Sequence, residues 1–310
     1  MTNRPTTATR RRRGPAHALV RWYRGGGAGN LLFTLPLLVI FALFSWWPIS
    51  RSLVLSFQHT NLVTPATWVG FDNFARVFAD PLLPTAAWNT LWFTILAVLI
   101  GFPVPILLAV FIGELRRTRG LASVLVYIPV IIPPVVAVLL WKQIFDPSPN
   151  GLLNTVLGWV GIGPLPWLQS AAMAMPSIVV QATWAGFGTT TIIYLAALMS
   201  APPELYEAAE LDGAGIAKRA WHITLPHLRT VILLMLILQV IGTFQVFTEP
   251  FVMTGGGPNN STLTVLMLIF RYAFVIGDYG KATALSLLLA LLLSMLSAVY
   301  LWATRKWNRT

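Results

Sequence analysis

The chain of 310 residues contains no cysteine, and only 10% of its residues are charged. Without cysteine there are no disulfides, no thiolate metal ligands and no cysteine nucleophile. A soluble globular domain carries about 25% charged residues, so the shortage of charge is large. Apolar side chains take up the difference, at 56% of the chain with a mean hydropathy of +0.72. This composition favours an integral membrane protein.

Several motifs that carry chemistry are also missing. The phosphate-binding pattern G-x-x-x-x-G-K-[ST] is absent, because the residues that follow the four lysines are never Ser or Thr. Neither H-E-x-x-H nor G-x-S-x-G occurs, and the four histidines are scattered along the chain. We therefore expect no catalytic residue, no cofactor site and no metal site in this chain, which cannot itself be an ATPase.

Long apolar segments take the place of these motifs. A membrane span needs about 20 mostly apolar residues to cross about 30 Å of hydrocarbon. Six uncharged segments meet this requirement and predict an all-α, polytopic membrane protein with six transmembrane helices. The segments are Leu31–Ser50, Leu91–Gly113, Leu121–Trp141, Met173–Met199, Thr230–Thr248 and Ala282–Thr304.

Proline predicts bends in two of these spans, because it removes a backbone hydrogen bond. Pro103 and Pro105 lie in the second span, and Pro129, Pro133 and Pro134 lie in the third. The uncharged stretch 147–203 is long enough for two spans. Glycine and proline interrupt it five times between residues 158 and 166, which indicates a structured loop instead.

The basic residues predict the orientation. With six spans, 16 of the 21 Lys and Arg residues fall on one side of the membrane, which the positive-inside rule makes the cytoplasmic side. A seventh span would put Lys218 and Arg219 outside. The net charge of +11 therefore reflects membrane orientation and does not indicate nucleic-acid binding. Both termini are predicted to be cytoplasmic.

Four regions follow from this reading. Residues 1–30 form a basic cytoplasmic tail, and 31–87 hold the first span with an outer loop. Residues 88–304 form the transmembrane core, and 305–310 form a cytoplasmic C-terminus. The outer loops are expected near 51–90, 142–172 and 249–281.

The cytoplasmic segment between the fourth and fifth spans has an unusual pattern. Pro203 suits the first turn of a helix that ends near Asp212, because Gly213 follows. A second short helix is expected from Ile216, and Pro226 marks the entry into the fifth span. The segment is therefore predicted to be a helix–turn–helix at the cytoplasmic face.

The first helix of this segment carries a stripe of like charge. Glu204, Glu207 and Glu210 share one face, which costs a few tenths of a kcal/mol per pair unless cations lie opposite. Ala208 and Ala209 keep the neighbouring surface small, so that another protein can approach closely. The simpler alternative is a solvated, charged loop.

This segment resembles the EAA-x3-G-x9-I-x-L-P signature of membrane subunits of ATP-binding-cassette importers. The matching residues are Glu207, Ala208, Ala209, Gly213, Ile223, Leu225 and Pro226. Four further stretches are similar to the sugar-importer branch, namely Trp68–Phe74, Tyr127–Pro129, Thr254–Pro258 and Tyr279–Ala282. The chain lacks the extra spans and outer domain of the larger disaccharide-importer homologue.

The resemblance implies the type I importer permease fold in a bacterial inner membrane. It implies that segment 200–227 is a coupling loop, with the signature residues docking into a cleft on an ATPase subunit. It further implies a second homologous permease, an ATPase dimer that binds ATP and Mg, and an external solute-binding protein, with lipid around the spans.

Polar residues inside the spans are candidates for the solute pathway, because burial in lipid is costly. They are mostly neutral amides and hydroxyls, with Glu249 near the outer end. Gln181, Trp184, Gln239 and Thr243 are predicted to contact a sugar-like, uncharged solute. Helix–helix hydrogen bonding explains each of them equally well. An ion-coupled secondary transporter is the alternative function, although buried carboxylates and inverted repeats are missing. An intramembrane enzyme lacks a nucleophile–base pair.

Overall fold

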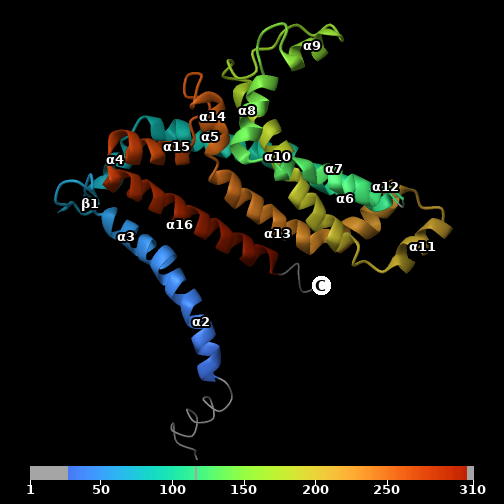
Figure 1. The fold of residues 1–310 in the computed structure, drawn as a ribbon, viewed down its shortest axis with the longest axis horizontal. Coiled ribbons are helices and arrows are strands. Elements are labelled where there is room, and N and C mark those ends of the chain that lie inside the picture. Colours follow the sequence, from blue (N-terminus) through green and yellow to red (C-terminus); the bar gives the residue numbers. More distant parts are fainter. Residues whose placement is uncertain (1–26, 116, 306–310) are drawn as a thin grey trace, which may run out of the picture. The chain divides into compact units, whose positions relative to one another are not determined.

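The computed structural model describes residues 27–115 and 117–305 (Figure 1). Most of the predicted tail 1–30 and of the predicted C-terminus 305–310 therefore lies outside the described residues. The chain divides into a first unit that ends at Val54 and a second unit from Leu55 to Thr310. Each unit is described by itself below.

The first unit is one long apolar helix. It consists of α2 (Gly27–Phe41), the π-helical turn η1 (Ala42–Trp46) and α3 (Trp47–Leu55), which reaches the unit boundary. Gly29–Leu55 meets the length and hydropathy of a membrane span. The predicted first span is confirmed and is longer than Leu31–Ser50.

Four uninterrupted apolar helices of the second unit are long enough to cross a membrane. Together with the first helix and one bent pair, they give six candidate spans in the described chain, and the predicted multi-span, all-α fold is confirmed. The four helices are Leu82–Glu114 (α5, η2 and α6), Ala174–Leu198 (α10), Ile216–Phe244 (α12, η3 and α13) and Tyr279–Thr304 (α16).

The predicted third span, Leu121–Trp141, is broken rather than kinked. It comprises α7 (Arg119–Ile131) and α8 (Pro134–Ile144), whose axes differ by 94°. Pro133 and Pro134 both lack an amide hydrogen, and the residue before a proline is disfavoured in the helical region. Ile132 is accordingly extended, with φ −72° and ψ 128°.

Two predicted boundaries were also wrong. The helix of the second span begins at Leu82 instead of Leu91, so that its first turns use residues assigned to the outer loop. The short helix expected from Ile216 is not separate, because it continues through η3 into the fifth span and ends at Phe244. Pro226 is compatible with this continuous helix because the turn before it is π-helical.

Three π-helical turns share one sequence pattern. Each starts at an alanine and lies six residues before a proline: η1 before Pro48, η2 (Ala97–Gly101) before Pro103 and η3 (Ala220–Thr224) before Pro226. In each case the amide of the residue before the proline bonds to the alanine carbonyl five residues back. Because a proline ring clashes with the carbonyl four residues back, the wider turn relieves the clash without ending the helix.

Short elements connect the spans of the second unit. β1 (Gln58–His59) pairs antiparallel with β2 (Thr67–Trp68), Gln58 opposite Trp68. The short helices are α4 (Asp72–Phe78), α9 (Leu152–Gly158), α11 (Pro203–Leu211), α14 (Thr248–Thr254) and α15 (Val265–Phe270), which η4 (Arg271–Ile276) extends. Positive φ at Gly255 and Gly256 is consistent with the predicted turn at Thr254–Pro258.

Helix α10 is the centre of the second unit, where it packs against α6, α7 and α13. The backbone of α7 approaches α10 closely at Gly188, which has no side chain. A Cβ atom at Gly188 would lie 2.4 Å from the Val126 carbonyl oxygen. Small residues at helix contacts are typical of membrane proteins, in which backbones approach closely and packing drives association.

Candidate functional site

Helix α11 is defined at both ends by its own sequence. Pro203 occupies the first turn with Glu204, where the partial positive charge of the helix end favours an anion. At the other end Gly213 has φ +74°, and the amide of Ala214 donates to the carbonyl of Ala209 over 2.8 Å. Glycine suits this position because a side chain is strained at positive φ. The predicted helix–turn is confirmed.

One face of α11 is open to solvent in the described chain. Glu204, Glu207 and Ala208 are exposed, and Ala209 is half-buried. Leu211 at the end of the helix is 90% exposed, and Trp221 beyond the turn is 70% exposed. Large apolar side chains that remain exposed beside a charged stripe are typical of a surface that binds another protein.

The opposite side of α11 is tied to the spans by polar contacts. The Tyr206 hydroxyl lies 3.0 Å from the Thr224 hydroxyl, which is buried. The buried guanidinium of Arg219 donates to Glu210 of α11 and to Glu114 at the end of α6, each over 2.6 Å. These contacts hold the helix in place while its outer face stays open.

The second half of the signature lies on a different element. Ile223 is in η3, and Leu225 and Pro226 begin α13, so the structure separates these three residues from the exposed face of α11. His227 lies 3.2 Å from both the Ser200 hydroxyl and the Ala197 carbonyl oxygen, and so joins α13 to the end of α10. His227, the residue directly after the signature, thus helps to position α13.

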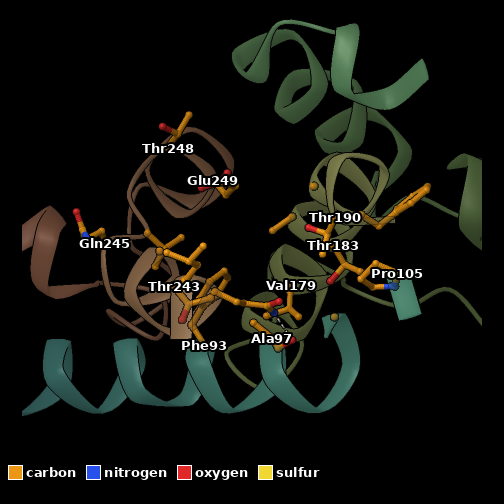
Figure 2. A pocket seen from close by; sticks show the side chains of 18 of the residues that line it. Phe93, Ala97, Pro105, Val179, Thr183, Thr190, Thr243, Gln245, Thr248 and Glu249 are labelled. Carbon is orange, nitrogen blue, oxygen red and sulfur yellow. Dashed lines mark hydrogen bonds between the residues drawn. The ribbon is translucent and has the colours of Figure 1, made fainter. Parts of the chain in front are cut away.

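A cavity of about 580 Å³ lies within the second unit (Figure 2). Its walls come from η2 and the adjacent ends of α5 and α6, from α10, and from α13 with the start of α14. Figure 2 labels Thr183 and Thr190 on α10 and Thr243 on α13. The lining combines apolar side chains with amides and hydroxyls, as is common in sites for small polar molecules.

The structure brings only two of the four predicted pathway residues into this lining. Gln239 and Thr243 line the cavity, and the Gln239 amide donates to the Ala97 carbonyl over 2.8 Å. Gln181 lies outside the lining and is 1% exposed. Trp184 is also outside, with its ring centroid 5.6 Å from that of Trp141. A role of these residues in solute binding remains a prediction.

The cavity has one ionisable side chain among its lining residues, all of which belong to the described part of the chain. That side chain is Glu249, in the first turn of α14, and the lining includes no Lys, Arg or His. The neighbouring polar groups are the side chains of Gln245 and Thr248. An uncharged, hydroxyl-rich molecule can exchange hydrogen bonds with this set of groups.

Two of the four stretches of the sugar-importer resemblance, Trp68–Phe74 and Tyr279–Ala282, meet at what we call the α4 end, residues 72–80 together with 278–281. The side-chain amide of Asn73 donates to the carbonyls of Ser56 and Gln58 over 3.0 and 2.8 Å. Arg76 pairs with Asp278, and Lys281 pairs with Asp80 over 2.6 Å. Two segments about 200 residues apart in the sequence are thus held together.

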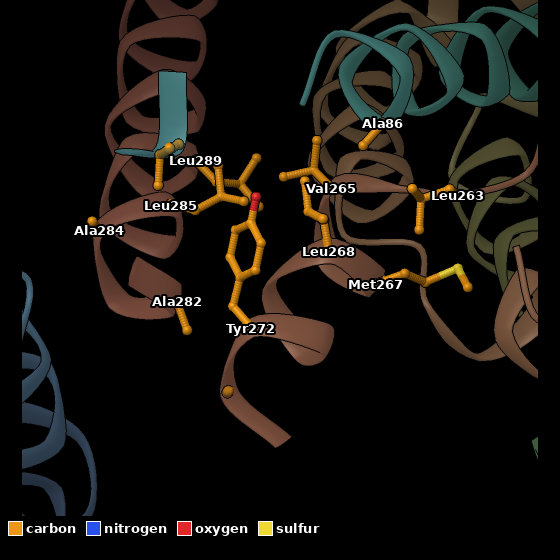
Figure 3. Close-up of a cluster of buried hydrophobic side chains, with 12 residues drawn as sticks. Ala86, Leu263, Val265, Met267, Leu268, Tyr272, Ala282, Ala284, Leu285 and Leu289 are labelled. Carbon is orange, nitrogen blue, oxygen red and sulfur yellow. The ribbon is translucent and has the colours of Figure 1, made fainter. Parts of the chain in front are cut away.

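Asp80 has a second donor, the Tyr272 hydroxyl at 2.7 Å. Figure 3 shows Tyr272 between α16, with Leu285 and Leu289, and the α15 residues. Burial raises the pKa of the Asp80 carboxyl, but hydrogen bonds from Lys281, Tyr272 and the Leu82 amide lower it by more, so that its pKa lies below the ordinary value.

Sequence reasoning missed several residues of these sites. On sequence alone, Arg219 contributes only to the predicted orientation and Glu114, which directly follows the predicted second span, is not considered, although a basic residue beside an acidic stripe is a signal for an ion pair. The cavity lining also includes Thr183, Thr190 and Glu249, none of which is among the predicted pathway residues. Their selection required knowing which face of each helix meets the cavity.

Comparison with known proteins agrees with the signature. The family described as binding-protein-dependent transport system inner membrane component matches residues 101–309. The arabinooligosaccharides transport system permease protein AraP of Bacillus subtilis (strain 168) is 32% identical over 276 residues, which cover 88% of each chain. The lactose transport system permease protein LacF of Rhizobium radiobacter is 32% identical over 295 residues, covering 93% of this chain and 97% of LacF.

A solved structure has the same fold. The bacterial alginate ABC transporter, crystallised in complex with an alginate pentasaccharide-bound periplasmic protein, contains a chain that matches with a TM-score of 0.82 and 27% identity. The match covers 94% of this chain and 99% of that one. This chain therefore belongs to the family of binding-protein-dependent transport system inner membrane components, as a multi-pass permease subunit of an importer.

Proposed function

We propose that this permease works with a second, homologous permease and with two ATP-binding-cassette ATPase subunits. The ATPase subunits bind ATP and Mg²⁺ and carry out the hydrolysis, and this chain takes no catalytic part. An external binding protein delivers the solute. The family to which the chain belongs is binding-protein-dependent, and the solved relative was crystallised with a loaded periplasmic protein, which supports this assembly.

The proposed solute is an uncharged sugar or short oligosaccharide. Two relatives are named for arabinooligosaccharides and lactose. The cavity lining offers amides and hydroxyls, one carboxylate and no cationic group. A carboxylate accepts hydrogen bonds from sugar hydroxyls and repels an acidic sugar, so the lining favours a neutral solute.

The proposed docking surface for the ATPase is the exposed face of α11, with Glu207, Ala208 and Ala209. One observation carries this proposal. The contacts of Arg219 and Tyr206 hold one side of α11 against the spans, while Glu207 and Ala208 stay exposed. In this arrangement the α11 end, residues 203–226 together with Glu114, is cytoplasmic, and both termini lie on the same side. Gly213 supplies the turn that lets α11 protrude.

Charge reversal tests the docking surface. Copurification of the ATPase with Glu207→Lys should fall at least about tenfold at unchanged membrane abundance, because an anion on the docking face is replaced by a cation. Asp72→Lys makes the same charge change at an exposed residue of α4 and should leave copurification intact. If Glu207→Lys retains the ATPase as well as the control does, α11 is not the docking surface.

Cysteine labelling can test the orientation without background reaction, because the natural chain has no cysteine. In intact cells, a cysteine at Asn61 should react with an impermeant thiol reagent, and a cysteine at Leu211 should react only after permeabilisation. Both positions are exposed in the structure. The reverse pattern would place the α11 end outside.

The solute pathway has its own test. Thr243→Ala and Gln239→Ala should raise the apparent KM for uptake several-fold, since each lost hydrogen bond is worth about 0.5–1.5 kcal/mol. Membrane abundance should stay normal. Trp184→Ala should instead reduce abundance, because Trp184 packs against Trp141 outside the cavity lining. Parallel losses of abundance and uptake in the Thr243 variant would rule out the pathway role.

A further inference from the structure

Arg219 is a buried cation at the junction of three helices. Its side chain is 9% exposed. One terminal nitrogen, Nη1, lies 2.6 Å from Oε1 of Glu210, and the other, Nη2, lies 2.6 Å from Oε2 of Glu114. A planar guanidinium can hold two carboxylates in this forked arrangement, whereas a lysine ammonium has no such fixed geometry.

Each partner belongs to an element with a separate role. Glu210 is on α11, the proposed docking helix, and Glu114 is the last residue of the helix Leu82–Glu114. That helix carries Gly101 and Pro105 in the cavity wall. Arg219 itself lies in the helix Ile216–Phe244, which carries Gln239 in the facing wall. One side chain therefore joins the docking helix to two walls of the cavity.

Breaking either ion pair of Arg219 is energetically costly, so the three helices should resist moving apart. A buried guanidinium that loses one of its carboxylates is left partly unpaired in a poorly solvated place, which is strongly unfavourable. Any displacement of α11 that kept α6 still would have to break the Arg219–Glu210 or the Arg219–Glu114 pair. Moving α11 and the end of α6 together keeps both pairs.

We propose that Arg219 is a positioning residue that makes α11 and the α6 wall of the cavity move together when the ATPase binds nucleotide. The inference rests on the proposed docking of the ATPase at α11. It adds that the displacement reaches the cavity through the two ion pairs of Arg219, and not only through the backbone that follows Gly213.

The experiment uses the complete transporter, with its ATPase subunits and binding protein, in proteoliposomes. A single cysteine in place of Thr243 reports on the cavity, since the natural chain has none. The rate of N-ethylmaleimide labelling is measured without nucleotide and with Mg²⁺–ATP plus vanadate. With Arg219 intact the two rates should differ at least about fivefold, the lower end of typical coupling between sites.

Two variants weaken the ion pairs of Arg219 in different ways. Arg219→Lys keeps the positive charge but loses the planar group that binds both carboxylates. Glu114→Gln keeps the Arg219–Glu210 pair and weakens the contact of Arg219 with α6. In both, the ATPase should still copurify, but the two labelling rates should differ less than about twofold. Arg271→Lys, at an exposed residue of η4, is the matched control and should behave like the parent chain.

The outcomes separate the two proposals. If the ATPase fails to copurify with the parent chain, the docking proposal is wrong. If the ATPase copurifies but the nucleotide-dependent change persists in Glu114→Gln, or is absent from the parent chain, the role of Arg219 is wrong. Should Arg219→Lys reduce membrane abundance, Glu114→Gln decides the question alone, because it leaves no cation without a carboxylate.

Discussion

The α4 end and the α11 end of this permease use charge in opposite ways. At the α4 end, Arg76 pairs with Asp278 and Lys281 pairs with Asp80, so these charged groups are satisfied within the chain. At the α11 end, Arg219 is buried between two carboxylates, while Glu207 stays exposed on the open face of its helix. The first arrangement stabilises the core, and the second leaves a surface available to a partner.

This difference separates the expected effects of mutations. Changes to the ion-paired residues of the α4 end should lower the stability of the chain itself. Changes on α11 and at its Gly213 turn should leave the chain folded and weaken its association with the ATPase. A single variant that does both at either end would contradict this division.

The largest effect is expected from Lys281→Met. The Asp80 side chain, which is 14% exposed, would lose its cation. Removal of one partner costs about 3–5 kcal/mol in a fully buried ion pair, and the loss should be smaller in this partly buried one. The thermal unfolding temperature of the detergent-solubilised chain should fall markedly. Lys142→Met is the control, because Lys142 is exposed and its Nζ atom donates over 3.3 Å to the neutral carbonyl oxygen of Val252. Equal losses in the two variants would mean that the α4 end is not an internal clamp.

A smaller effect is expected from Gly213→Ala. A side chain at positive φ costs about 1–2 kcal/mol, which should tilt or unwind the end of α11. ATPase copurification should fall several-fold, while the unfolding temperature hardly changes. Gly215→Ala is the matched control, since Gly215 has φ −67° and open space where a Cβ would lie. A loss of the same size in the control would mean that the backbone conformation at Gly213 is unimportant.

Tyr206→Phe should give the next smaller change. It removes the 3.0 Å contact with the Thr224 hydroxyl, which is worth about 1 kcal/mol. The apparent affinity for the ATPase should weaken up to about fivefold, as measured by titrating purified ATPase onto the permease. Tyr127→Phe, at a residue that is 41% exposed on α7, should have no effect. An unchanged affinity in Tyr206→Phe would show that α11 is held by Arg219 alone.

The smallest effect on stability is expected when the pH is lowered. Because the pKa of Asp80 is lowered in the folded chain, its contribution to stability is fully present above its ordinary value of 3.8 and is lost as the pH falls through the folded value. The difference in unfolding temperature between the natural chain and Asp80→Asn should therefore be full at about pH 6 and shrink below about pH 4. A difference that grows on acidification would mean that the pKa shift has the opposite sign.

The sequence predicts the spans well, because about 20 apolar residues in a row have few alternatives to a membrane helix. The sequence does not predict whether a proline breaks a helix or is accommodated within it. Pro133 and Pro134 break the third span, whereas Pro226 is carried inside a continuous helix after a π-helical turn. The same residue type thus ends one helix and is tolerated in another, and hydropathy does not distinguish the two cases.

The docking helix could be predicted from its local signals, since Pro203 and Gly213 act within a few residues. The contacts behind it could not. Glu114 and Arg219 are 105 residues apart, and nothing near either residue indicates the other. Gln181 was grouped with Gln239 for its amide, but only packing showed that Gln181 is buried away from the cavity lining.

The 94° break between α7 and α8 has a consequence for how the chain enters the bilayer. The two helices have 13 and 11 residues, so they extend only about 20 and 16 Å at 1.5 Å per residue, against about 30 Å of hydrocarbon. Neither can insert as an independent stage of assembly in the way that a full-length helix does. We therefore expect the bent form of this pair to become stable only once α10 is present, because Gly188 of α10 receives the backbone of α7. The order of synthesis places α10 after the pair, so the third span is expected to reach its bent form late and together with α10.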